Sequence, residues 1–200
     1  DPYILYEPGG YMDVTNACYQ SINSRKVRVE GGLWVSSKKY TVKLEGARVA
    51  GYQTSLLVLL RDNNYVKNAI KWTEKLSIFL SKEIKQRMNL DSHEYSLDFR
   101  HIGLNAVFGD LEKNIGNPSE VGVLCIITSK TPNVCTEIAK LINPFLLHFP
   151  LTVDEELPTF AFPYSPVHSD RGCVYEFALH HVLELNDPMD AFQILSLIHI

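Results

Sequence analysis

Residues 53–60 read Gln-Thr-Ser-Leu-Leu-Val-Leu-Leu, in which an apolar run follows three polar residues. A short run of this kind, without alternation of polar and apolar residues, is typical of a strand buried on both faces. Residues 120–128 form a second run of the same character. Both strands are expected at the centre of a sheet, where each face needs a covering layer.

Two amphipathic helices are predicted, one before and one after the second apolar run. Asp62 is expected to cap the first helix through its carboxylate. The second begins at Thr131, a capping hydroxyl, followed by Pro132, which suits a first turn. Pro144 is expected to kink or end this second helix. The residues of the first helix that recur three or four positions apart are Val66, Ile70, Thr73, Leu76, Leu80, Ile84 and Met88.

The order of predicted elements from residue 53 is strand, helix, strand, strand, helix, strand. This is the order of the ferredoxin-like split βαβ arrangement, an α+β fold in which the first and third strands are central. The fold class expected is therefore α+β, with a ferredoxin-like βαββαβ sheet and two helices. The four strands are expected at residues 53–60, 95–99, 120–128 and 173–185.

Three segments are expected along the chain. Residues 1–50 are interpreted as an irregular lead-in, over residues 1–10, and β-hairpins that continue a missing amino-terminal domain. One hairpin joins residues 17–21 to 26–30, and a separate short strand covers 41–44. Residues 51–194 are expected to form the ferredoxin-like domain. Residues 195–200 resemble translated adapter sequence and are interpreted as a non-native tail.

Composition excludes several classes of function. The net charge of −4 and the lack of a basic run argue against nucleic acid as a partner. No apolar stretch reaches the ~18 residues that cross a bilayer, so we expect no membrane partner and a cytoplasmic location. The cysteines have no C-x-x-C spacing, and no metal is expected. Cys125 and Cys135 are predicted to be buried, reduced thiols. Nothing in the sequence indicates a cofactor.

The stretch around Lys43, Glu45 and Arg48 is the most pointed candidate for binding chemistry. In an extended strand Lys43 and Glu45 project from one face and can pair. The functional hypothesis is a substrate-binding group in which the cations anchor a carboxylate or phosphate. The alternative is a surface ion pair beside a bulge, which contributes little.

Three further residues complete the candidate set. Arg61 directly follows a buried strand and precedes a helix, a position where loops often carry function, although the turn can serve only to cap the helix. Ser165 lies in a proline-rich loop and is a substrate-binding candidate, without the G-x-S-x-G elbow of serine hydrolases. His181 lies on the apolar side of its predicted strand, where an imidazole needs a partner. It is the catalytic candidate, and the alternative is a satisfied core histidine.

Several stretches of the sequence carry a family signature in a fixed order. They are Tyr-Thr-Val-Lys-Leu-Glu-Gly-Ala-Arg at 40–48 with Gly51-Tyr52, Gly-Leu-Asn-Ala-Val-Phe-Gly at 103–109, Leu-Leu-His-Phe-Pro at 146–150, Ala-Phe-Pro-Tyr-Ser-Pro at 161–166, and Val-Tyr-Glu-Phe at 174–177 leading to His181-Val182 and Asp187-Pro188. Together they resemble the acyclic terpene utilisation AtuA family over most of residues 1–194. The chain departs from that family at Arg61-Asp62-Asn63, where relatives tend to have Arg-Asp-Pro.

The resemblance implies a larger amino-terminal part and a link to the breakdown of branched acyclic terpenoids such as citronellol and geraniol. Two hypotheses follow. In the first, the chain is part of a catabolic enzyme or enzyme subunit that handles a branched acid or its thioester, with the reaction unspecified. In the second, it is a non-catalytic ferredoxin-like module for assembly, whose partner is the amino-terminal part, a second copy or a small subunit.

Overall fold

The computed structural model describes residues 3–154, 157 and 160–192. The protein is α+β, with antiparallel sheets and three α-helices within these residues. It divides into two compact units. Unit 1 contains Asp1–Arg48 and Glu176–Ile200, and unit 2 contains Val49–Tyr175. Two long strands, β6 (Tyr40–Leu60) and β10 (His168–Leu185), contribute residues to both units.

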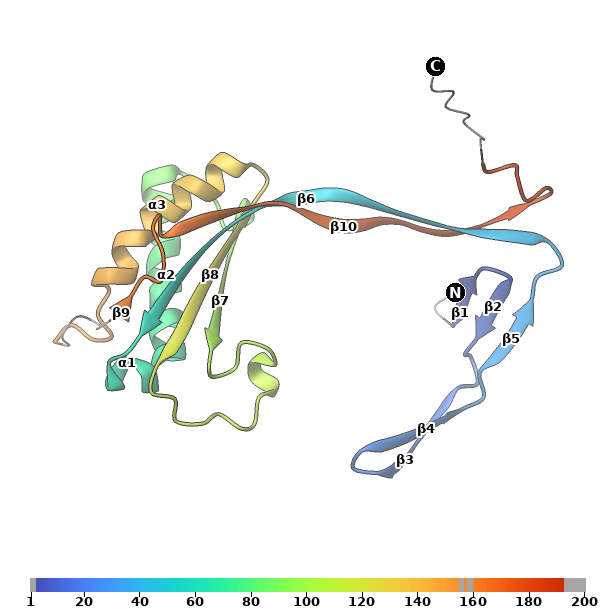
Figure 1. Ribbon diagram of the computed structural model, residues 1–200, viewed down its shortest axis with the longest axis horizontal. Coiled ribbons are helices and arrows are strands. Elements are labelled where there is room, and N and C mark those ends of the chain that lie inside the picture. The colour runs from blue at the N-terminus through green and yellow to red at the C-terminus, as the bar shows by residue number, and fades with distance from the viewer. Residues whose placement is uncertain (1–2, 155–156, 158–159, 193–200) are drawn as a thin grey trace, which may run out of the picture. The chain divides into compact units, whose positions relative to one another are not determined.

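Unit 2 is built on a sheet with the strand order β10-β6-β8-β7 (Figure 1). Strand β8 (Val121–Ser129) lies between β6 and β7 (Tyr95–Ile102) and is antiparallel to both. The short strand β9 (Phe160–Ala161) pairs with the end of β6. The two apolar runs are thus the central strands, as predicted, because Leu56 on β6 lies opposite Cys125 on β8.

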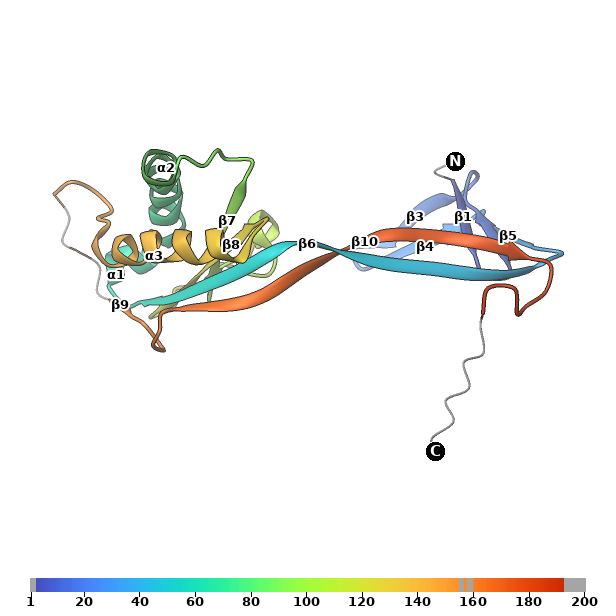
Figure 2. The same ribbon diagram turned by 90° about the horizontal axis from the view of Figure 1, so that it is seen from above.

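The helices cover one face of this sheet (Figure 2). Helices α2 (Ala69–Met88) and α3 (Pro132–His148) supply most of the layer, and α1 (Asn63–Lys67) precedes α2. Cys125 and Cys135 are buried free thiols, as predicted. The fully buried side chains between helices and sheet include Leu56, Val58, Leu60, Trp72, Leu76, Leu80, Ile84, Val123, Ile127, Ile138 and Ile142.

The helices differ from the predictions in three details. The expected single helix after Asp62 is two helices, because Asn68 ends α1 and its side-chain amide bonds back to the Asn64 carbonyl at 2.9 Å. Thr131 occupies the N-cap position of α3, but its hydroxyl makes no capping bond. Pro144 does not end α3, which continues for another turn to His148.

Strand β6 is continuous for 21 residues, although separate strands at 41–44 and 53–60 were predicted. Gly46 and Gly51 lie within this strand, at positions where another segment approaches closely. A Cβ at position 51 would lie 2.7 Å from the Ser129 carbonyl oxygen, and one at position 46 would lie 3.3 Å from the Leu179 Cβ. Glycine in a strand often marks such an approach, so it need not interrupt the pairing.

Unit 1 contains a three-stranded sheet in the order β1-β2-β5 and a separate hairpin. The sheet strands are β1 (Ile4–Glu7), β2 (Gly10–Asp13) and β5 (Leu33–Ser36), and the hairpin strands are β3 (Cys18–Asn23) and β4 (Lys26–Glu30). The predicted hairpin is confirmed. The irregular lead-in over residues 1–10 is wrong for its described part, because Pro8 and Gly9 form only the tight turn between β1 and β2.

Unit 1 buries little of its surface. Among its described residues only Gly10 and Leu185 are buried. The apolar side of β10 is largely exposed in unit 1, where Phe177 is 80% exposed and Leu179 is 46% exposed. The hairpin is exposed along both strands. Unit 2 therefore holds the hydrophobic core, and unit 1 is held mainly by strand pairing and surface contacts.

Residues 195–200, which the sequence suggested to be a non-native tail, lie outside the described residues. Within the described part of the chain, no helix has the length and apolar character needed to cross a membrane.

Candidate functional site

Unit 1 contains a cavity of about 830 Å³, which we call the unit 1 cavity. Its walls come from β1, β2, the segment between β5 and β6, the start of β6 and the C-terminal part of β10. The apolar part consists of Ile4, Leu5, Tyr6, Tyr11 and Val182, and the polar part of Glu7, Ser37, Lys38, Thr41, His180, His181 and Glu184. Apolar walls with a few convergent polar groups are the usual make-up of a small-molecule site.

Hydrogen bonds and ion pairs fix the segments that form this cavity. The Gly9 amide donates to the Thr41 hydroxyl at 2.6 Å, and the Ser37 amide donates to the Gly9 carbonyl at 2.8 Å. These bonds tie the turn between β1 and β2 to the beginning of β6. The rings of Tyr6 and Tyr11 lie 5.8 Å apart and form part of the wall.

Most charges at the cavity are already paired. The Lys43 ammonium lies 3.2 Å from Glu7 and 3.2 Å from Glu45. Its pKa is raised above the ordinary value, because hydrogen bonds to Glu7 and then to Glu45 stabilise the charged form. Lys39 lies 3.2 Å from Glu184. Lys38, which lines the cavity, has no carboxylate partner among the described residues.

The structure brings four of the sequence-predicted residues into unit 1. Lys43 and Glu45 form the ion pair expected from strand alternation. Arg48 pairs with Glu176 at 2.7 Å, where both side chains are exposed. Neither Arg48 nor Glu45 lines the cavity, and Lys43 reaches it only through its contact with Glu7.

His181 is one of the residues that line the unit 1 cavity. Its side chain is exposed, in contrast to the core position that its place on an apolar strand side suggested. Its neighbour His180 also lines the cavity, and the His180 Nδ1 lies 3.9 Å from a Glu45 carboxylate oxygen. His180 and His181 are thus both among the residues of the cavity lining, as is Lys38.

Arg61 and Ser165 lie in unit 2 and do not belong to this cavity. The Arg61 guanidinium donates to the Ser119 carbonyl, which ties the end of β6 to the segment before β8. Ser165 is exposed and precedes a cis-proline, Pro166. The predicted substrate-binding set is thus divided between the two units.

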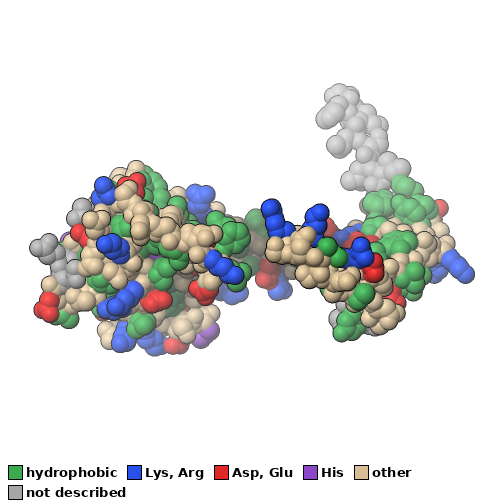
Figure 3. All heavy atoms as spheres, turned by 90° about the horizontal axis from the view of Figure 1, so that it is seen from below, with side chains coloured by type: hydrophobic (Ala, Val, Ile, Leu, Met, Phe, Trp, Pro, Cys, Tyr) green, Lys and Arg blue, Asp and Glu red, His purple; other side chains and the backbone are tan. Residues whose placement is uncertain are grey.

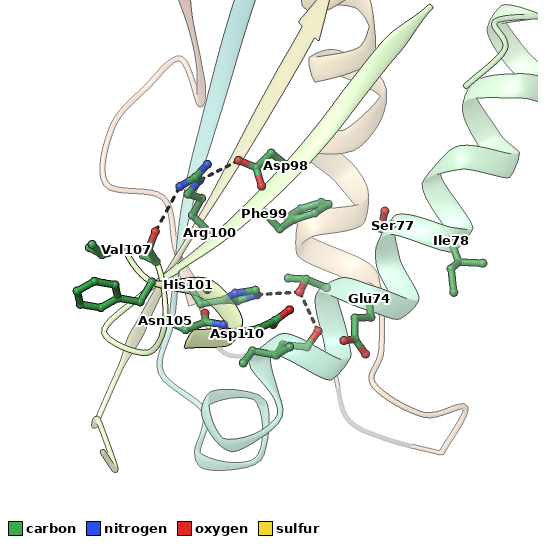
Figure 4. Close-up of a pocket in the computed structure, with 15 residues that line it drawn as sticks. Glu74, Ser77, Ile78, Asp98, Phe99, Arg100, His101, Asn105, Val107 and Asp110 are labelled. Atoms are coloured by element: carbon green, nitrogen blue, oxygen red, sulfur yellow. Dashed lines mark hydrogen bonds and ion pairs between the residues drawn. The ribbon is translucent and has the colours of Figure 1, made fainter. Parts of the chain in front are cut away.

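Unit 2 has a second cavity of about 870 Å³, which we call the His101 cavity (Figure 4). Helix α2, strand β7 and the segment 103–110 form its walls. His101 is buried, with 6% of its surface exposed, and its Nε2 lies 2.8 Å from the Thr73 hydroxyl oxygen. The Thr73 hydroxyl donates its proton to the Ile70 carbonyl at 2.8 Å.

This chain of contacts assigns the protonated nitrogen of His101. A threonine hydroxyl has one proton, and that of Thr73 is committed to Ile70. The Thr73 oxygen can only accept from His101, so Nε2 carries the ring proton. The pKa of His101 is lowered because burial penalises the charged form, while Asn105, Glu74 and Asp98 oppose the shift. Burial thus favours the neutral imidazole, which bonds to α2 through Thr73.

Besides His101, the charged groups of the His101 cavity are three carboxylates and one guanidinium. Asp98 pairs with Arg100 at 2.8 Å, and Glu74 and Asp110 also line the walls (Figure 4). Val107 and Phe108 contribute apolar surface and are 84% and 62% exposed. Among the described residues, no cluster of His, Cys, Asp or Glu side chains could hold a metal ion.

The sequence analysis missed Lys38 and His101. A signal for His101 exists, because Tyr95, Leu97, Phe99 and His101 occupy alternate positions of one strand. An imidazole at the end of such an apolar face needs a hydrogen-bond partner. No comparable signal marks Lys38, whose importance depends on the pairing of its neighbours Lys39 and Lys43 with carboxylates from other strands.

No family model matches the chain. Comparisons with curated proteins and with solved structures also found no match.

Proposed function

We propose that the chain is an AtuA-like protein, part of a catabolic enzyme or enzyme subunit that acts on branched acyclic terpenoid-derived acids or their thioesters. The observation that carries this proposal is the unit 1 cavity, which is lined by apolar side chains and by Lys38, a lysine without a carboxylate partner among the described residues. A branched acid has the complementary composition, a hydrocarbon body with one charged end.

The cavity is suited to such a ligand in size and chemistry. Its volume of about 830 Å³ lies in the range of small-molecule sites. Tyr6, Tyr11 and Val182 offer apolar contact to the hydrocarbon, and Lys38 offers an ammonium to the carboxylate. His181 is the group we propose for proton transfer, because it lines the cavity and is open to a ligand.

The arrangement of unit 2 supports a ferredoxin-like topology. Its elements follow the order strand, helices, two strands, helix, strand, and the sheet order β10-β6-β8-β7 places the first and third long strands in the centre. We also place the protein in the cytoplasm, where its four free cysteines would remain reduced.

Ligand-dependent stabilisation tests the proposed function. The chain is heated with citronellic acid, geranic acid and their coenzyme A thioesters, and the unfolding midpoint is recorded by differential scanning fluorimetry. A ligand at 100 times its Kd adds about 2.7 kcal/mol to stability, which raises the midpoint visibly. A shift with branched compounds that is absent with acetate supports the proposal. Equal midpoints with and without every branched ligand would contradict it.

A second candidate function, a non-catalytic assembly module, is favoured by the exposed apolar surface of unit 1. Tyr19 and Val27 on the hairpin are 74% and 61% exposed, and Phe177 on β10 is 80% exposed. The face in Figure 3 carries acidic and basic side chains interspersed among apolar ones. Exposed apolar surface on this scale often marks a protein interface.

Light scattering after size exclusion tests the assembly function. The module requires a second copy or a small subunit on unit 1, so Phe177→Asp is expected to abolish an oligomer that Ser96→Asp, on an exposed part of β7, leaves intact. A monomeric wild-type chain at high concentration would remove the self-association form of this function.

A further inference from the structure

We propose that the unit 1 cavity selects a free carboxylic acid over its coenzyme A thioester, and that Lys38 is the residue that determines this specificity. This inference rests on the proposed function, because it names the form of the substrate that the same cavity takes. Three features of the cavity lead to it: the ammonium group of Lys38, the carboxylates of Glu7 and Glu184, and the apolar side chains of the lining.

In the part of the chain that the structure describes, one cation of the cavity has no carboxylate partner. The acidic, basic and histidine side chains of the cavity are Glu7, Lys38, His180, His181 and Glu184. Glu7 lies 3.2 Å from Lys43, and Glu184 lies 3.2 Å from Lys39. Lys38 is the remaining lysine on the wall, and no described carboxylate lies within ion-pair distance of it. An incoming carboxylate can therefore pair with Lys38 without breaking an existing ion pair.

The same pairing pattern disfavours a ligand with several negative charges. A coenzyme A thioester lacks the free carboxylate and carries several phosphate charges, which need several cations or backbone donors. Lys39 and Lys43, which contact the wall carboxylates Glu184 and Glu7, are already paired with them. Glu7 and Glu184 on the cavity wall add repulsion toward phosphate. Repulsive groups of this kind are a common source of specificity.

The hydrocarbon part of the acid has a defined place in the cavity. Ile4, Leu5, Tyr6, Tyr11 and Val182 form the apolar wall, and Lys38 and His181 lie on the same cavity. Removing a branched chain from water contributes roughly 0.8 kcal/mol for each buried methylene group. The apolar wall thus supplies affinity, while Lys38 distinguishes an acid from a neutral or multiply charged derivative.

Calorimetric titration with three matched compounds tests the inference. Citronellic acid, the neutral alcohol citronellol and citronellyl-coenzyme A share one hydrocarbon chain and differ at its end. We expect the acid to bind about 10-fold or more tightly than the alcohol, because a hydrogen bond to a charged group contributes roughly 1.5–3 kcal/mol. The thioester is expected to bind more weakly than the acid.

Variants assign the preference to Lys38. Lys38→Gln is expected to reduce affinity for the acid to that for the alcohol and to leave the alcohol unchanged, whereas Lys38→Arg retains the preference. Both changes are at an exposed side chain, so the fold should tolerate them. Lys26→Gln, a matched loss of charge on the hairpin away from the cavity, is expected to leave all three affinities unchanged.

The outcomes separate this inference from the proposed function. Equal binding of acid and alcohol, tighter binding of the thioester, or an unchanged preference in Lys38→Gln would overturn the role of Lys38 while the cavity remains a binding site. Failure of all three compounds to bind would overturn the proposed function and this inference with it. A preference for the acid that Lys38→Gln removes supports both.

Discussion

The buried residue His101 connects α2 to the segment that follows β7. His101 donates to Thr73 on α2, and its own carbonyl accepts from the amides of Leu104 and Asn105. Protonation would place a charge among groups that are largely removed from water, and the lowered pKa of His101 expresses that cost. The residue is therefore expected to make stability depend on pH.

We predict that unit 2 loses stability as the pH falls below 6.5, the ordinary pKa of histidine. Above that pH both folded and unfolded states are neutral at His101. Below it the unfolded state binds a proton first, so the free energy of unfolding falls until the lowered folded-state pKa is passed. Urea titrations followed by the fluorescence of the buried Trp72 measure this effect.

The control for this prediction is His101→Gln, which removes the titrating group and can still donate to Thr73. Its stability is expected to change less between pH 7 and pH 5 than that of the wild type. His148→Gln, at the end of α3, provides a matched loss of another histidine. The prediction is wrong if His101→Gln retains the full wild-type dependence on pH.

A comparison of His181 with His101 shows what the pattern of residues along a strand can and cannot predict. His181 and His101 both occupy the apolar side of a strand, so sequence alone assigns both the same need for a partner. Only His101 lies under a helix, where Thr73 meets it. His181 is exposed, so no described residue buries it. Alternation predicts which side a residue faces, but it does not predict whether that side is covered.

At the scale of elements, local sequence signals predicted where most helices and strands begin. They seldom predicted how far these elements continue. Asp62 caps α1 as expected, since its carboxylate accepts from the amides of Asn64 at 2.8 Å and Tyr65 at 3.2 Å. The continuity of β6 through Gly46 and Gly51 was not predictable, because it depends on contacts with Leu179 and Ser129. Those partners are distant in sequence, and no local propensity reports them.

We predict that Asp62→Ala destabilises unit 2 by about 1 kcal/mol, the usual cost of losing an N-cap. Asp62→Asn is the matched variant, because asparagine caps helices nearly as well and lacks only the charge. Urea denaturation of the three proteins measures the difference. If Asp62→Asn is as destabilised as Asp62→Ala, the negative charge near the helix start matters more than the hydrogen bonds to Asn64 and Tyr65.

At the scale of the whole molecule, the two units differ in how they are stabilised. The apolar runs, the helix periodicity and the strand order were readable from sequence because they concern unit 2, which has a core. Unit 1 lacks such a signal. Its strands β1, β2 and β5 are four residues each and carry few buried side chains. Short, exposed strands leave little periodicity to read, and their pairing depends on backbone hydrogen bonds.

We predict that this difference appears in amide hydrogen exchange. Amides on β8 are expected to exchange only through global unfolding, because its neighbours β6 and β7 and the helix layer bury them. Amides on β3 and β4 should exchange many times faster, since an isolated two-stranded hairpin is marginally stable in water. Mass spectrometry of peptides from residues 18–30 and 121–129 measures both regions in one sample.

The pattern of exchange also distinguishes the two functions proposed for unit 1. Added citronellic acid should slow exchange in peptides that contain Lys38 and His181, which line the cavity, and leave residues 18–30 unchanged. A partner that covers the exposed hairpin should instead slow residues 18–30, where Tyr19 and Val27 present their apolar side chains. Hairpin amides that are as protected as those of β8 in the isolated chain would contradict the prediction, because they would require a covering surface already in place.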